Sequence, residues 1–115
     1  MHPLAPVPGD PAAIRAFAAR VRSQARQVST VEADVRGAVD CMTFQGPAAT
    51  EFRAGAGSWR GSARSVAAEL ESIATRLEGI ARKVEHDQRE RERKLERMRR
   101  MDADERRREA QRNKL

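Results

Sequence analysis

The chain has 115 residues, of which 39% are hydrophobic and 35% are charged, and its formal net charge is +6. This length allows one small domain, and a composition rich in Ala, Arg and Glu with only four aromatic residues favours long helices over a β-sandwich or barrel. No apolar run approaches the ~20 residues of a membrane span, and the single cysteine, Cys41, excludes an internal disulfide or a zinc cluster.

Residues 1–9 are rich in proline and predict a disordered leader, with no apolar segment of the kind found in signal peptides. Asp10 and Pro11 follow as a helix start, because Asp caps helices and proline is favoured at the first helical position.

A first helix is predicted over residues 11–41, since apolar residues recur there at seven-residue spacing. The first series is Ile14, Val21, Val28, Val35 and Met42, and the second, three residues later, is Phe17, Gln24, Val31 and Ala38. With Gln24 as the polar exception, the pattern gives the broad apolar stripe of a bundle helix.

Gly46 and Pro47 interrupt the periodicity, since glycine ends helices and proline begins them. The apolar steps of four and three then resume without a miss, at Phe52, Ala56, Trp59, Ala63, Val66, Leu70, Ile73, Leu77, Ile80 and Val84. A second helix is therefore predicted over residues 47–85 or beyond.

Residues 86–115 are predicted as a charged C-terminal helical extension or tail. Acids precede bases by four residues at Glu85–Arg89, Asp87–Arg91, Glu90–Lys94, Glu96–Arg100, Asp102–Arg106 and Asp104–Arg108. Such pairs support a solvated helix, and mixed charge of this kind argues against a nucleic-acid site.

The fold predicted from these elements is all-α: an antiparallel hairpin of two long helices over residues 10–85. Two such stripes cannot bury each other fully, so pairing with a second hairpin into a four-helix bundle is expected, as a homo- or heterodimer. The residues expected to bind that partner are Phe52, Trp59, Val66, Leu70, Ile73 and Leu77.

The predicted turn carries Phe44, Gln45 and Gly46, followed by small residues and Phe52. A helix, an aromatic-x-Gly turn and a second helix resemble the WXG (ESAT-like) family of hairpins exported by type VII (ESX) secretion systems, with Phe-x-Gly in place of Trp-x-Gly. The aromatic ring is expected to plug the end of the bundle. A literal Trp59-Arg60-Gly61 lies inside the second apolar repeat, and Trp59 matches the aromatic that this family often carries about fifteen residues after the turn.

The resemblance implies a type VII secretion substrate, or a small targeting partner of a larger type VII effector, found outside the cell or in the envelope and in the cytoplasm before export. The family's Tyr-x-x-x-Asp/Glu export signal, read by the secretion ATPase, has its counterpart at His86 and Glu90. Because the chain has no tyrosine, a partner hairpin with an intact signal is expected.

The alternative is a cytosolic coiled-coil adaptor or structural protein with weak nucleic-acid contact through its basic tail. An enzyme is not expected, because no nucleophile–base set and no carboxylate pair falls on the apolar face. The sequence likewise suggests no cofactor, no metal and no small-molecule substrate.

Overall fold

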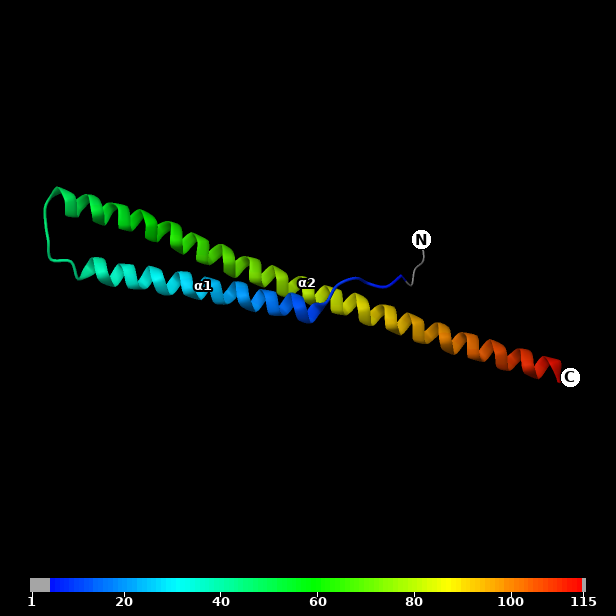
Figure 1. Ribbon diagram of the computed structural model, residues 1–115. Coiled ribbons are helices and arrows are strands. Elements are labelled where there is room, and N and C mark those ends of the chain that lie inside the picture. Colours follow the sequence, from blue (N-terminus) through cyan, green and yellow to red (C-terminus); the bar gives the residue numbers. More distant parts are fainter. Residues whose placement is uncertain (1–4, 115) are drawn as a thin grey trace.

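The computed structural model describes residues 5–114, which form two antiparallel helices. Helix α1 comprises Pro11–Asp40 and helix α2 comprises Pro47–Asn113, with no strand among the described residues. The molecule is a rod of 104 × 23 × 12 Å (Figure 1). This confirms the predicted all-α hairpin, and the reversal lies at Gly46 and not at Trp59, which is inside α2.

Both helices begin at a proline, as the sequence predicts. The carboxylate of Asp10 accepts hydrogen bonds from the backbone N–H groups of Ala12 and Ala13, at 3.1 and 3.2 Å, and so caps α1. Helix α2 has no side-chain cap, and Gly46 precedes it with φ +115° and ψ 178°. This backbone conformation is essentially confined to glycine.

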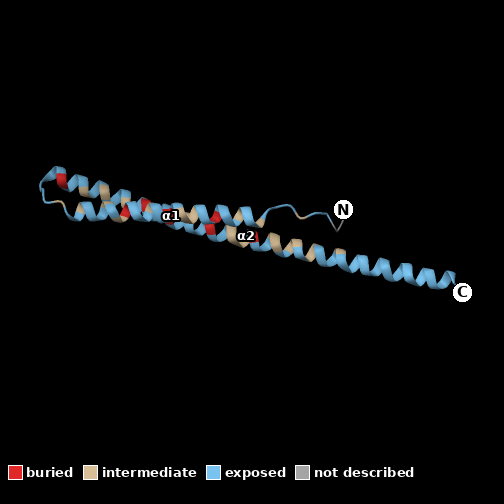
Figure 2. Ribbon diagram, turned by 60° about the horizontal axis from the view of Figure 1, so that its bottom comes forward, coloured by how far each residue is buried: buried red, intermediate tan, exposed pale blue. Residues whose placement is uncertain are grey.

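The seam between the helices is built almost entirely of alanine. The buried apolar residues are Ala18, Ala25, Ala49, Ala63, Ala67, Ala74 and Ala81. Figure 2 places the buried positions where the two helices run side by side. Because alanine is small, the two helices approach closely, and among the described residues no large side chain is fully buried.

Ionic contacts across the hairpin fix its register. Arg15 forms a salt bridge with Glu85 at the end of the hairpin away from the turn. The Arg22 guanidinium lies 2.6 Å from the Glu78 carboxylate, and the Arg60 guanidinium lies 3.1 Å from the Glu32 carboxylate, nearer the turn. As the α1 number rises, the α2 number falls, as antiparallel pairing requires.

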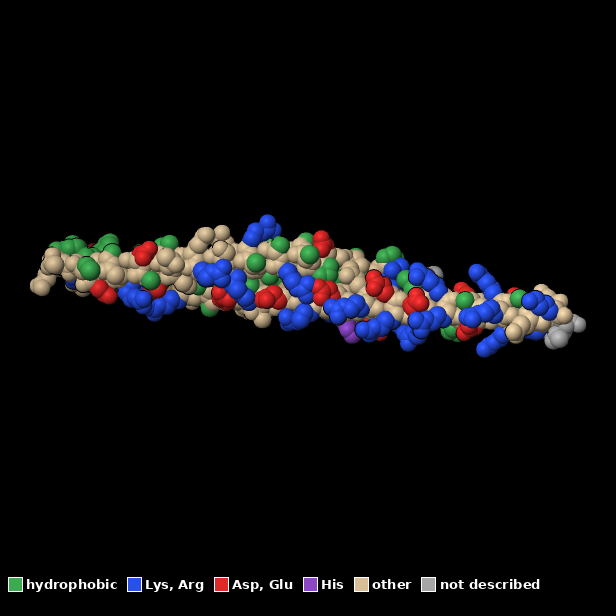
Figure 3. Space-filling model, turned by 90° about the horizontal axis from the view of Figure 1, so that it is seen from below, with side chains coloured by type: hydrophobic (Ala, Val, Ile, Leu, Met, Phe, Trp, Pro, Cys, Tyr) green, Lys and Arg blue, Asp and Glu red, His purple; other side chains and the backbone are tan. Residues whose placement is uncertain are grey.

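Helix α2 continues far beyond α1, and its residues 89–113 are called the arm below. Of the predicted pairs, Glu85–Arg89 (3.0 Å) and Glu96–Arg100 (3.3 Å) are present. Glu90 and Asp104 instead contact the bases three residues later, Arg93 and Arg107. Figure 3 shows Lys and Arg alternating with acids along this half of the molecule.

The leader is only partly covered by the structure, because residues 1–4 lie outside the described residues and its predicted disorder is untested there. Residues 5–9 have no regular secondary structure. The side-chain amide of Gln88 donates to the backbone oxygens of Val7 and Gly9, at 3.3 and 3.0 Å. This part of the leader is therefore held where the arm begins.

Candidate partner-binding surface

Large apolar side chains form an exposed row along one face of the hairpin, called the apolar stripe below. Its members are Phe17 and Val31 of α1 with Phe52, Trp59, Val66, Ile73 and Ile80 of α2, and they are 42–54% exposed. The α2 members are spaced by seven residues, close to two helical turns, so they remain on one face.

The apolar repeat of α2 therefore divides between two surfaces. Phe52, Trp59, Val66 and Ile73 lie in the exposed stripe. Leu70 and Leu77 are half-buried and stand three residues after the buried Ala67 and Ala74. Of the six residues expected to bind a partner, four face solvent and two lie at the border of the seam.

Two hollows flank the Trp59 side chain. One, of about 370 Å³, is lined by Val35, Phe52, Gly55, Ala56 and Trp59, and the other, of about 280 Å³, by Gln24, Gln27, Val28, Val31 and Trp59. A Cβ placed on Gly55 would meet nothing within 4 Å. Both helices line each hollow, so the surface beside Trp59 is shallowly indented where α1 and α2 meet.

Phe44, at the turn, does not plug the hairpin of the single chain, because 51% of its surface is exposed. The Arg53 guanidinium lies 6.0 Å from the Phe44 ring centroid and donates a hydrogen bond to the Phe44 carbonyl oxygen at 3.0 Å. Arg53 thus holds the turn against α2, while the ring remains open on its other side.

Glu32 is the one charged side chain buried in the described chain, at 6% exposure. Its carboxylate accepts a hydrogen bond from Arg60 Nε at 3.1 Å and lies 3.1 Å from Arg64 Nη2. The Arg60 hydrogen bond, with the nearby charges of Arg64 and Arg36, lowers the pKa of Glu32. Sequence analysis missed this cluster, although Glu32 follows Ala18 and Ala25 at seven-residue spacing.

The candidate export signal lies where α2 leaves α1. His86 is exposed and Glu90 is half-buried, and Glu90 bonds to Arg93 one turn further along. Both residues are four positions apart on one helix, which gives them the spacing of the family's signal. Their role remains a prediction.

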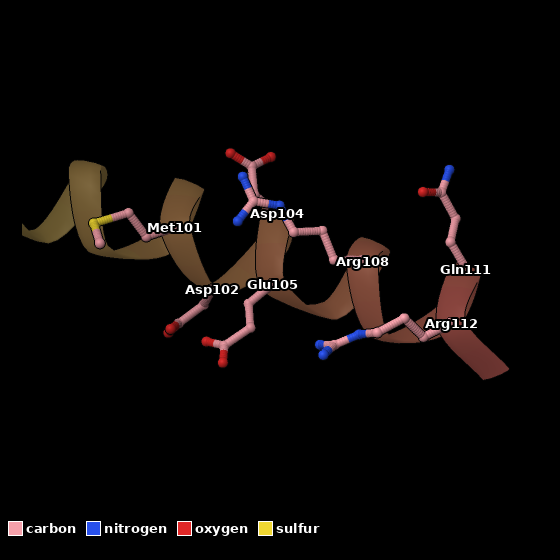
Figure 4. A pocket seen from close by; sticks show the side chains of 7 residues that line it. All are labelled: Met101, Asp102, Asp104, Glu105, Arg108, Gln111 and Arg112. Atoms are coloured by element: carbon pink, nitrogen blue, oxygen red, sulfur yellow. The ribbon is translucent and has the colours of Figure 1, made fainter.

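The arm carries a wider hollow of about 800 Å³, lined by Met101, Asp102, Asp104, Glu105, Arg108, Gln111 and Arg112. Figure 4 shows that these side chains all come from a single helix, and no second element encloses the space. It is therefore a gap between solvated side chains.

No group of His, Cys, Asp and Glu in the described residues could hold a metal ion. In the same residues no helix is both long enough and apolar enough to cross a membrane.

Comparison with known protein families gives a match over most of the chain. Residues 8–88 match the family model described as "WXG100: Proteins of 100 residues with WXG". The matched range covers most of the chain and ends where the arm begins. No curated protein and no solved structure matches the chain.

Proposed function

Because the chain belongs to the WXG100 family, we propose that it serves a type VII secretion system. In this proposal it is an exported substrate or the small targeting partner of a larger effector. It acts by pairing its helices with those of another hairpin, and not by catalysis.

The observation that carries this proposal is the exposed apolar stripe. Its seven side chains keep roughly half of their surface in water, and burying the remainder gains on the order of 1 kcal/mol for each. Exposed apolar patches of this kind mark protein interaction sites, so the stripe supports pairing with a second apolar surface.

The partner that fits best is another hairpin, which completes a four-helix bundle. Its larger side chains would occupy the hollows on either side of Trp59. Both a second copy of this chain and a different WXG100 chain meet that description, so the pairing experiment uses both.

The pairing experiment compares two charged substitutions on α2. Ile73→Asp places a carboxylate in the stripe and should abolish pairing through the stripe, because a charge cannot be buried there without a partner. Ser65→Asp, at an exposed position outside the stripe and the seam, adds the same charge and should leave association intact.

Sedimentation of the chain alone, and of its mixture with a neighbouring WXG100 protein, reports both variants. A folded wild-type monomer at micromolar concentration in both samples would contradict the proposal.

Export is proposed to need the partner, because His86 stands where the family signal has tyrosine. The chain is expressed in a host with an active type VII system, with and without a candidate partner hairpin. The lone chain should be retained, and either the partner or His86→Tyr should restore its secretion. Efficient secretion of the lone chain, unaffected by His86→Ala and Glu90→Ala, would refute the requirement.

A further inference from the structure

After a polar interruption at Gln88 and Arg91, two apolar residues recur in the arm in phase with the α2 seam, beyond the stretch of α2 that packs against α1. Leu95 follows Ala81 and Gln88 at seven-residue spacing, and Met98 follows Val84 and Arg91 in the same way. Leu95 is half-buried and Met98 is 48% exposed. The arm extends alone beyond α1 (Figure 1), so this short apolar face has no helix packed on it among the described residues.

Charged residues frame this face in a specific order. Arg91 lies one turn before Leu95 on the face, and Asp102 lies one turn after Met98. Glu92 and Arg99 follow one edge of the face, and Lys94 and Met101 follow the other. Figure 4 shows Asp102 and Glu105 projecting from one side of α2, while Asp104 and Gln111 project from the opposite side.

We propose that this face pairs with the arm of a second copy of the chain, antiparallel, over residues 91–102. Leu95 and Met98 occupy the a and d positions of one heptad. In an antiparallel helix pair, position a of one helix packs against position d of the other, so Leu95 packs against the second copy's Met98. Arg91 then lies opposite the second copy's Asp102, and Glu92 lies opposite its Arg99. The twofold axis repeats every contact, and no like charges meet across the contact.

The same charges reject a parallel pair. Parallel helices would place each Arg91 beside the other Arg91, and each Asp102 beside the other Asp102. Lys94 would face the second copy's Arg99 across the edge of the helix pair. The charges around this face therefore favour a second arm that runs antiparallel over one that runs parallel.

The contact is short, because twelve residues span about 17 Å and bring together only four Leu and Met side chains. It should therefore be weak, concentration-dependent and sensitive to salt. It uses no residue of the apolar stripe, so it goes beyond the proposed function and joins two hairpins tail to tail.

A charge-exchange series tests the contact by sedimentation equilibrium at low salt, in the full-length chain carrying Ile73→Asp, so that pairing through the stripe does not mask it. Glu92→Arg alone, or Arg99→Glu alone, sets like charges opposite each other twice and should weaken association at least tenfold. The double exchange, Glu92→Arg with Arg99→Glu, restores opposite charges and should recover it.

Arg100→Glu is the matched control, because Arg100 and Arg99 both contact Glu96 and Arg100 lies away from the face. It should change association little. A loss with Arg100→Glu equal to that with Arg99→Glu, or no recovery in the double exchange, overturns the proposal.

Disulfide formation tests the direction, in a Cys41→Ser background that removes the native thiol. A mixture of Lys94→Cys and Met101→Cys chains should form the mixed disulfide faster than either chain forms a disulfide with itself. Parallel arms would reverse that order.

Adding Ile73→Asp to both chains separates this contact from pairing through the stripe. Mixed-disulfide formation that survives Ile73→Asp supports an autonomous arm contact. Its disappearance would show that the arms meet only when the stripes assemble, and would overturn the proposal.

Discussion

At the scale of single residues, Gly46 and Glu32 are two positions that set the geometry of the hairpin. Gly46 adopts φ +115° and ψ 178°, so the chain can reverse before α2 begins. Glu32 is buried in the alanine seam and is held there by Arg60 and Arg64. The first position allows the chain to turn, and the second is one of the cross-hairpin ion pairs that match the residues of the two helices.

Gly46→Ala should lower the free energy of unfolding by about 1–3 kcal/mol, because a side chain is strained in this backbone region even where space is available. Gly57→Ala is the control, since Gly57 lies inside α2 with open space around it and should gain up to about 1 kcal/mol. Chemical denaturation followed by circular dichroism measures both. Equal effects of the two substitutions would show that the turn is not confined to glycine.

Glu32→Gln tests the buried ion cluster through its pH dependence. The Arg60 hydrogen bond lowers the pKa of Glu32 below its ordinary value of 4.5, so the unfolded chain binds more protons than the folded chain at that site. The stabilisation is therefore present above pH 4.5 and is lost as the pH falls through the folded-state pKa. Denaturation curves of wild type and Glu32→Gln should differ at pH 7 and converge in acid. A difference that is constant with pH would contradict the assignment.

At the scale of the element, α2 has two apolar faces with different tasks. Its alanine positions are closed by α1, whereas its large residues stand in the exposed stripe. Ile73 and Ala74 are adjacent in the sequence yet are 42% and 0% exposed. One step of about 100° along the helix separates the exposed stripe from the seam.

Ala74→Leu should therefore destabilise the hairpin by about 1–3 kcal/mol, because a larger side chain does not fit between helices that are spaced for alanine. Ile73→Leu conserves volume at an exposed position and should change stability by less than about 0.5 kcal/mol. Thermal unfolding of the two variants compares the faces directly. A stable Ala74→Leu hairpin would mean that the helices separate easily and that the seam is not closely packed.

At the scale of the whole molecule, the described chain combines a packed hairpin with a single unpaired helix, the arm, which is nearly as long as α1. Contacts between α1 and α2, together with cross-hairpin ion pairs, support the hairpin. The arm has ion pairs along its own surface, and pairs of this kind contribute only about 0.2–0.5 kcal/mol each. The two parts should therefore open with very different free energies.

Hydrogen exchange of the full chain measures that difference. Amides of residues 60–85 should exchange slowly, because the hairpin must open to expose them. Amides of residues 103–113 should exchange far faster, by fraying of an unsupported helix end. Arm protection that rises with protein concentration would fit the proposed pairing of arms. Equal protection in both parts at the lowest concentration would contradict the weak-arm interpretation.

The sequence by itself determined the two helices, their starts and the place of the turn. Apolar spacing, Asp10-Pro11 and Gly46-Pro47 are local signals, and helix formation and its interruption are local events. The arm was also visible as the point where the apolar repeat yields to alternating charge. The six expected partner-binding residues were all drawn from one continuous apolar repeat. Spacing alone does not show which residues of the repeat are exposed and which lie beside the seam.

Only the tertiary structure decided which part of that stripe is closed. Which residues are closed depends on the rotation of α2 about its own axis relative to α1. Alanine occupies the seam because it allows the closest approach of the two backbones. That rotation leaves Trp59 and Ile73 open and places Leu70 and Leu77 at the border. It also sets Arg60 beside Glu32, twenty-eight residues away in sequence. A contact between distant residues needs the register of both helices, and neither helix alone contains it.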